Sequence, residues 1–165
     1  MDRDELKAVQ GPIKDRYREE PAAALITLEA QGELGEGVSC SVQTGRALVA
    51  AGLHPGTGGD GAHACSGDML LQALVACAGV TMRSVATSLG LDVRGSVRAE
   101  GDLDFRGTLG VDKAVPVGFT DIRLVFSLDT EASEEELATL LRLTERYCVV
   151  LQTLAGSPRL SAEIV

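Results

Sequence analysis

The stretch from Ser66 to Leu89 reads SGDMLLQALVACAGVTMRSVATSL, and the rest of the chain is organised around it. From residue 68 onward, apolar side chains fall on nearly every face of a helix. A helix that is apolar on all sides is buried, either in a protein core or in a membrane. Arg83 and the polar residues near it leave fewer than the ~18 unbroken apolar residues of a membrane span, so the sequence predicts a central core helix.

Both ends of this helix carry suitable residues, and its middle carries a thiol. Ser66 is a good N-cap, Asp68 suits the positive end of the helix dipole, and Gly90 is placed to end the helix. Cys77 lies near the centre. Cys148 follows a second strong helical segment and opens the short apolar run CVVLQTL, too far along the chain for a local CxxC motif. Only tertiary packing can bring these two cysteines together.

Composition indicates one soluble globular domain over residues 1–165. The chain is 45% hydrophobic and 24% charged, and 165 residues are enough to bury a sizeable core. Its aromatic share is only 3%, with no Trp, and its net charge is −9. Stacking platforms and phosphate-backbone contacts are therefore not expected, and we predict neither a nucleic-acid nor a membrane partner.

The N-terminus favours a cytoplasmic protein. It reads MDRDELKAVQ, which is charged and lacks the apolar segment of a signal peptide. Thiols are kept reduced in the cytoplasm, so the four cysteines are expected to be inert, metal-binding or redox-active rather than a disulfide framework.

The first fifty residues change from a helical to a strand pattern. Residues 2–19 predict two short helical pieces interrupted by Gly11 and Pro12, an arm within residues 1–20 that lies on the body, reaches a partner subunit or is simply solvated. Period-2 patterns then predict a strand at residues 23–30 and a hairpin partner at 38–43, with a third strand at 46–51. Gly32, Gly35 and Gly37 mark the turn, and Cys40 is expected to be a small buried apolar residue of the second strand.

Residues 52–64 form a glycine-rich loop, GLHPGTGGDGAHA, predicted to cross the end of the core helix. It lacks the GK[ST] ending of a phosphate-binding loop, so a nucleotide site is not indicated. Four residue types that ligate metals occur in or beside it, without a standard zinc spacing. They are His54, Asp60, His63 and Cys65.

The second half of the chain predicts an antiparallel strand pair and two helices. Residues 93–104 and 120–128 alternate apolar and polar side chains, as in strands with one buried and one solvent-exposed face. Asp102 and Asp104 form a DxD motif, and their place on the exposed face explains them better than binding of a divalent metal does. Ser133 to Glu136 is a capping box that begins a helix ending or bending near residues 144–147. Pro158 ends the next segment, and residues 159–165 alternate as a terminal strand. The order predicts an α+β fold with antiparallel sheet.

Two segments of this order resemble the OsmC/Ohr family of thiol-dependent hydroperoxide reductases. They are SGDMLLQALVACAGVTMRSVA and RYCVVLQTL, and the resemblance covers roughly residues 25–165. It implies an intertwined homodimer with long helices packed between two sheets. It also implies that Cys77 attacks an organic hydroperoxide and that Cys148 resolves the product, with a dithiol or lipoyl-type reductant and without a cofactor or metal ion.

The same resemblance implies supporting roles for Arg46 and Asp68, although the chain departs from the family pattern. Gly67 and Asp68 stand where the family usually has Pro-Glu, and Val149 replaces the Pro that normally follows the second cysteine. Asp68 precedes Cys77 by nine residues, which places it on the opposite side of a regular helix. It therefore contributes only if the helix begins irregularly or if it orients Arg46.

The chemistry of such a site requires a thiolate at Cys77, because the thiolate is the nucleophile. Attack on a peroxide leaves a sulfenic acid, and a second thiol within reach condenses with it to a disulfide. Three alternatives remain: inert core cysteines, a non-catalytic OsmC-fold protein that binds a small molecule or serves in a stress response, and a metal-dependent enzyme. The last would use His54, His63 and Cys65.

Overall fold

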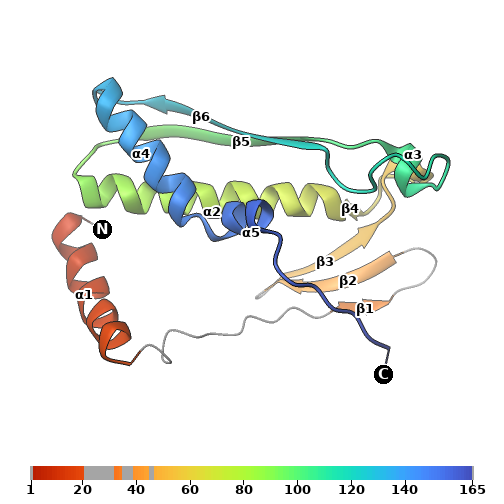
Figure 1. Cartoon of the computed structure of the whole chain (residues 1–165), viewed down its shortest axis with the longest axis horizontal. Helices are drawn as coiled ribbons and strands as arrows, with labels where there is room; N and C mark the ends of the chain where they lie inside the picture. The colour runs from red at the N-terminus through yellow and green to blue at the C-terminus, as the bar shows by residue number, and fades with distance from the viewer. Residues whose placement is uncertain (1, 21–31, 35–38, 45–46, 165) are drawn as a thin grey trace. The chain divides into compact units, whose positions relative to one another are not determined.

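The protein has a mixed helix and sheet architecture, shown in Figure 1 as a computed structural model. The structure describes residues 2–20, 32–34, 39–44 and 47–164. The chain forms two compact units, one of Met1–Gly11, Ala73–Arg98 and Leu124–Val165 and the other of Pro12–Gln72 and Ala99–Arg123. Neither unit is a continuous piece of sequence, because α2 (Ser66–Leu89), β5 (Arg94–Asp102) and β6 (Asp121–Asp129) each have residues in both.

The N-terminal arm is one helix, α1 (Arg3–Glu19), with Pro12 inside it. The prediction of two pieces broken at Gly11 and Pro12 is therefore wrong. Proline removes one backbone hydrogen bond, which disfavours a helix without always ending it. At the start of α1, the N–H of Asp2 donates to the carboxylate of Glu5, and the N–H of Glu5 donates to that of Asp2. This reciprocal cap satisfies two backbone donors at the helix start.

The first sheet has the order β1-β2-β3-β4. Its strands are β1 (Gly32–Leu34), β2 (Ser39–Thr44), β3 (Ala47–Gly52) and β4 (Ala64–Cys65). The first three pair antiparallel, with Cys40 opposite Ala51, which confirms the predicted second and third strands. β4 pairs parallel with β3, so this sheet is mixed rather than purely antiparallel.

Two details of this sheet differ from the sequence prediction. Gly32 is the first residue of β1 rather than part of a turn. Its pairing with Val42 supplies the backbone hydrogen-bond partners that local sequence cannot reveal. The strand predicted at residues 23–30, and the turn residues Gly35 and Gly37, lie outside the described residues.

Helix α2 begins at Ser66 and runs without interruption to Leu89. Gly90 ends it with a φ of +75°, a conformation that costs glycine little, and the N–H of Leu91 donates to Ala86 O over 2.9 Å. By length and composition α2 satisfies the criteria for a membrane span, criteria that core helices also meet. From Ala73 onward, α2 packs through Met82 and Ala86 against Val93, which directly precedes β5, and against Leu140 of α4 (Glu134–Tyr147). Phe126 and Leu128 of β6 pack against the same cluster.

Burial of α2 is confined to one stripe within this chain. Leu74, Ala78, Met82 and Ala86 are buried, as residues four apart on one helix face. Val80 is 72% exposed, so the single chain does not bury α2 on every side. Apolar residues of β6 pack on one face of the helix, and within the described part of the chain the side bearing Val80 stays exposed.

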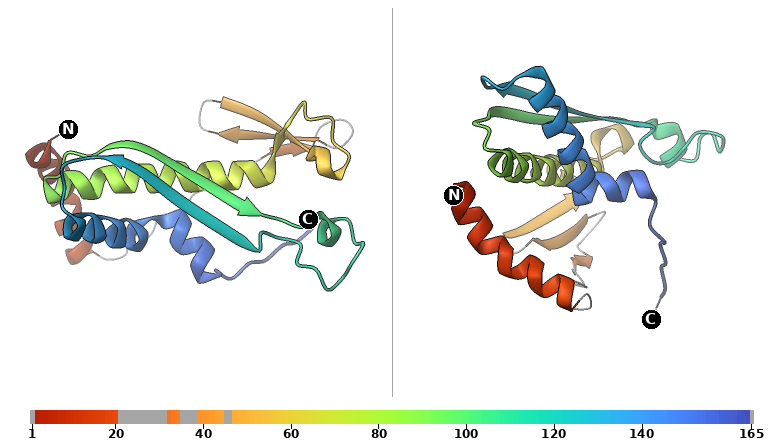
Figure 2. Two further views of the ribbon diagram at one scale, coloured as in Figure 1. Left: turned by 90° about the horizontal axis from the view of Figure 1, so that it is seen from above. Right: turned by 60° about the vertical axis from the view of Figure 1, so that its left-hand side comes forward.

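β5 and β6 form a separate two-stranded sheet. Their arrows point in opposite directions in Figure 2, which confirms the predicted antiparallel pair. At one end the N–H of Thr120 donates to Asp102 O over 2.9 Å. At the other, Gly95 has a φ of +131°, and a Cβ there would lie 2.0 Å from Ser127 O. Only glycine permits this close approach of the two strands.

The predicted capping box begins α4 (Glu134–Tyr147), where Ser133 and Glu136 cap each other. Cys148 ends α4 and begins α5 (Val149–Gly156), as the predicted bend requires. The predicted terminal strand is wrong, because residues 157–164 contain neither helix nor strand. A strand needs a neighbour for its backbone groups, and in the described chain this alternating segment has none. Leu160 is 86% exposed as a result.

Candidate active site

The two cysteines singled out from the sequence lie together in one of the two units. Cys77 belongs to the Ala73–Arg98 part of this unit and Cys148 to its Leu124–Val165 part. Both are free thiols. Cys148 is 0% exposed, and Cys77 is partly buried. The Cys148 thiol lies within hydrogen-bonding range of the Cys77 sulfur. Packing has therefore joined two groups that are far apart in the sequence.

The start of α5 supplies the polar environment of this pair. Cys148 is the N-cap of α5, and its side chain makes no capping hydrogen bond. The first backbone N–H groups of a helix have no partner inside the helix, and they carry its positive dipole end. Those of Val149 and Val150 donate instead to the Cys77 sulfur. The first turn of α5 thus takes the place of a cation beside this thiol.

These contacts favour the thiolate of Cys77. Burial by itself raises the pKa of Cys77, but hydrogen bonds from the N–H of Val150, the Cys148 thiol and the N–H of Val149 outweigh it and lower the pKa below the ordinary thiol value. The Thr81 hydroxyl adds a smaller contribution in the same direction. Hydrogen bonds to the charged form of a group stabilise that form. Cys77 is therefore the more acidic thiol of the pair.

The pKa of Cys148 is shifted in the opposite direction, above the ordinary thiol value. Burial raises the pKa of Cys148, and the neighbouring Cys77 raises it further, while the backbone N–H of Leu151 opposes the shift. Two thiols in contact do not both ionise, because the second anion would face the first. The Cys148 thiol therefore donates a hydrogen bond to the Cys77 sulfur, and Cys77 is the member of the pair on which a negative charge is favoured.

Sequence reasoning missed Thr81 and the N–H groups of Val149 and Val150. Thr81 follows Cys77 by four residues, and residues four apart share a helix face, so helical spacing alone would have indicated it. The identity of residue 149 also matters, because a proline at this position would have no N–H to donate to the Cys77 sulfur. The departure of this chain from the expected Cys-Pro step adds a donor to the site.

Of the two residues predicted to support the site, the structure describes Asp68 but not Arg46. Asp68 is exposed in the first turn of α2, which is helical from Ser66, so the irregular helix start considered above does not occur. Arg46 lies outside the described residues. Their roles at the site stay predictions.

The remaining cysteines occupy the first sheet. Cys65 is the last residue of β4, directly before α2, and is partly buried. Cys40 lies in β2, and its predicted burial lies outside what the structure describes. Both belong to the other unit.

The candidate metal ligands have other contacts. His54 Nδ1 accepts a hydrogen bond from the N–H of Gly56 over 2.9 Å, and its ring stacks on Phe105 at 5.0 Å between centroids. Asp60 accepts from the N–H of Ala62. No three His, Cys, Asp or Glu side chains in the described part of the chain are grouped to hold a metal ion.

The two aspartates of the DxD motif have separate structural tasks. Asp102 pairs with Arg123 across the β5–β6 sheet. Asp104 caps the short helix α3 (Phe105–Thr108) and pairs with Arg106 at 2.6 Å. Asp102 lies at the end of β5 with its side chain exposed, as the alternation predicts, whereas Asp104 lies beyond the strand, so the strand predicted over residues 93–104 is too long.

Comparisons with known proteins agree with this fold. No curated protein matches the chain. Among solved structures, an OsmC-like protein from Mycoplasma pneumoniae is 18% identical with a TM-score of 0.66, over 79% of this chain and 89% of that one. An organic hydroperoxide resistance protein OsmC from Legionella pneumophila is 20% identical with a TM-score of 0.58, over 81% and 92%.

The organic hydroperoxide resistance protein OhrB of Bacillus subtilis is 16% identical, with a TM-score of 0.51 over 81% of this chain and 93% of that one. These likenesses establish the fold. The family model described as OsmC-like protein matches residues 58–163, which is more than half of the sequence and includes both Cys77 and Cys148. The chain belongs to the OsmC-like protein family.

Proposed function

We propose that this protein is a thiol-dependent peroxidase that reduces organic hydroperoxides, with Cys77 as the peroxide-attacking residue and Cys148 as the resolving one. Family membership and the likeness to organic hydroperoxide resistance proteins support a redox or stress role. The observation that carries the proposal further is the contact between the two thiols, whose pKa values are displaced in opposite directions.

The proposed reaction balances with these two residues and one external dithiol. The Cys77 thiolate attacks the peroxide, the O–O bond breaks, and the sulfur becomes a sulfenic acid. The leaving alkoxide takes up a proton from water and departs as the alcohol. The Cys148 sulfur then attacks Cys77, so that an S–S bond forms while the S–O bond breaks. The hydroxyl group leaves with the Cys148 proton as water. A dithiol or lipoyl-type reductant returns both electrons by thiol–disulfide exchange.

Peroxide consumption by matched variants tests the assignment. Purified protein is supplied with a dithiol and cumene hydroperoxide, and we expect Cys77→Ser to reduce consumption to the rate without protein. Cys65→Ser is the control, because it removes a partly buried thiol of the other unit. If Cys77→Ser consumes peroxide as fast as the unmodified protein, Cys77 is not the attacking residue. If the unmodified protein does not exceed the rate without protein, the peroxidase proposal is overturned in favour of a non-catalytic protein that binds a small molecule.

Peptide mapping tests the resolving role separately. After one equivalent of cumene hydroperoxide, we expect a peptide in which Cys77 is joined to Cys148, with Cys40 unmodified. A link between Cys65 and Cys77 would keep the peroxidase and remove Cys148 from the resolving role. Recovery of Cys77 as a free thiol would contradict both.

Arg46 and Asp68 are proposed as supporting residues, on the resemblance alone. Removing one electrostatic stabiliser of a transition state typically costs ~10²-fold in rate. Arg46→Ala is therefore expected to slow peroxide turnover by ~10²-fold at an unchanged melting temperature. If turnover is unchanged, Arg46 has no place at the site.

A homodimer is proposed as the working assembly. Val80 of α2 and Leu160 of the C-terminal segment are 72% and 86% exposed, and a second copy would cover such surface. Sedimentation at micromolar concentration should then give about 34 kDa, twice the chain mass of 17.2 kDa. A clean 17.2 kDa species would rule out this assembly.

A further inference from the structure

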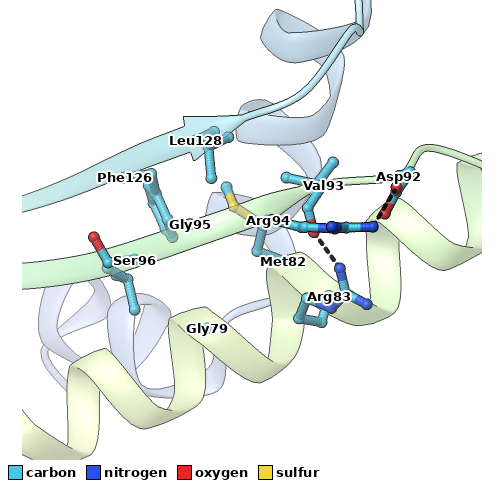
Figure 3. A pocket seen from close by; sticks show the side chains of 11 residues that line it. Gly79, Met82, Arg83, Asp92, Val93, Arg94, Gly95, Ser96, Phe126 and Leu128 are labelled. Atoms are coloured by element: carbon cyan, nitrogen blue, oxygen red, sulfur yellow. Dashed lines mark hydrogen bonds and ion pairs between the residues drawn. The ribbon is translucent and has the colours of Figure 1, made fainter.

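A cavity of about 510 Å³ lies between α2 and the β5–β6 sheet, within the unit that also holds the cysteine pair (Figure 3). Cavities of ~300–1,000 Å³ with apolar walls and a few polar groups are typical of small-molecule sites. The inner wall here is apolar. It consists mainly of Met82, Val93, Phe126 and Leu128.

Glycine keeps this space open on the helix side. Gly79 lines the cavity on α2, and a Cβ there would lie 3.3 Å from Val97 Cγ1 on the facing strand. A larger residue would extend into the gap between α2 and β5. The mouth is formed by exposed residues of β5, Arg94, Gly95 and Ser96.

Charged groups gather at one end of the cavity, as Figure 3 shows for Arg83, Asp92 and Arg94. Arg83 donates from one nitrogen to Val93 O, which holds its guanidinium at the cavity rim. A guanidinium has five N–H donors, and this bond uses one of them. Arg94 pairs with Asp92 at 3.5 Å, and both side chains are 78% exposed.

An exposed ion pair of this kind contributes little free energy, so a competing anion displaces it readily. The two arginines and one aspartate leave one positive charge in excess, in a chain whose net charge is −9. This end of the cavity is therefore suited to a negatively charged group, and its planar guanidiniums match the geometry of a carboxylate.

We propose that this cavity binds an amphipathic organic anion, a carboxylate with an apolar tail. The carboxylate lies between Arg83 and Arg94, and the tail lies against Met82, Phe126 and Leu128. Such a ligand satisfies both ends of the cavity at once. A neutral apolar molecule leaves the arginines unused, and an inorganic anion leaves the apolar wall in contact with water.

The cavity is distinct from the thiol site. Successive helix residues are rotated by about 100°, so Gly79 and Met82 lie about 160° and 140° around α2 from Cys77. The thiol faces the start of α5, and the cavity residues face the sheet. The proposal therefore stands without the peroxidase chemistry, and the Cys77→Ser variant is expected to bind the anion with unchanged affinity.

Selective ¹³C labelling of methionine methyl groups gives a direct test, because Met82 lines the cavity and Met69 belongs to the other unit. Dodecanoate is added to the full chain. We expect the Met82 methyl resonance to shift saturably at ~0.1 mM ligand or less, while the Met69 resonance stays fixed. Dodecan-1-ol, which has the same tail without the charge, should bind at least 10-fold more weakly.

Matched charge reversals locate the carboxylate. Arg94→Glu should weaken dodecanoate binding at least 10-fold, and its exposure means that the fold is not at risk. Arg142→Glu reverses an exposed arginine of α4 outside the cavity and should leave binding unchanged. A fixed Met82 resonance, as expected if a second copy of the chain covers the cavity, overturns the proposal. Equal binding of the alcohol, or of dodecanoate by Arg94→Glu, overturns it as well.

Discussion

Two faces of α2 meet different kinds of partner in the same unit. On one face Cys77 contacts backbone N–H groups of α5, the thiol of Cys148 and the hydroxyl of Thr81. On the other, Met82 and Ala86 pack in a cluster with Val93, which directly precedes β5, and with apolar side chains of β6 and α4. The first face uses directed hydrogen bonds to stabilise a charge, and the second uses area removed from water to stabilise the fold. A substitution should therefore change stability on one face and acidity on the other.

The largest expected effect is on the packed face. Leu140 of α4 is 0% exposed and packs against Met82 and Ala86. Leu140→Ala should lower the free energy of unfolding by about 2–5 kcal/mol, because it leaves a cavity in the core. Its neighbour Leu141 is 43% exposed and serves as the control, with an expected change within about 1 kcal/mol in urea denaturation. Equal losses for the two variants would show that α4 is packed differently.

The next effect concerns the acidity of Cys77. Because its pKa is lowered, Cys77 ionises at a lower pH than an ordinary thiol, and alkylation by iodoacetamide should reach half its maximal rate there. Cys148→Ala removes a donor to the thiolate and should raise this midpoint by about 1 pH unit. Cys148→Ser keeps a donor and should retain the low midpoint. The rate is followed on the Cys77 peptide by mass spectrometry, and an unchanged midpoint in the alanine variant would contradict the described contact.

A smaller shift of the same midpoint is expected from Val149→Pro. Proline is well suited to the first position of a helix, and Cys148 already has the extended backbone, ψ 107°, that a residue before proline requires. The variant should therefore keep α5 while removing one N–H donor, and raise the pKa of Cys77 by about 0.5 pH unit. Val149→Ala retains the N–H and should leave the midpoint in place. A proline variant with the original midpoint would remove this donor from the site.

The smallest effect is expected from the hydroxyl of Thr81. Its hydrogen bond is the weakest of those that lower the pKa of Cys77. Thr81→Val exchanges the hydroxyl for a methyl group of similar size and should raise the alkylation midpoint by about 0.3 pH unit. Thr81→Ser should restore the low midpoint. If both variants shift it equally, packing at Thr81 rather than its hydroxyl is responsible.

Where the sequence prediction was wrong, it had relied on local signals in places governed by distant partners. Gly11 and Pro12 predicted a helix break, but the helix continues through them. Alternation in residues 159–164 predicted a strand, yet alternation states only which side chains share a face, and the described chain provides no neighbouring strand.

Local patterns were sufficient to predict the long apolar helix, the β5–β6 strand pair, the Ser133 capping box and the two cysteine segments that resemble the family. Each of these depends on residue spacing within one segment, which a sequence states directly. Packing between distant segments places the first turn of α5 against Cys77, lowers the pKa of Cys77 and raises that of Cys148. Those outcomes depend on which buried N–H groups have no partner in their own helix and on the distant sulfur that packs against them.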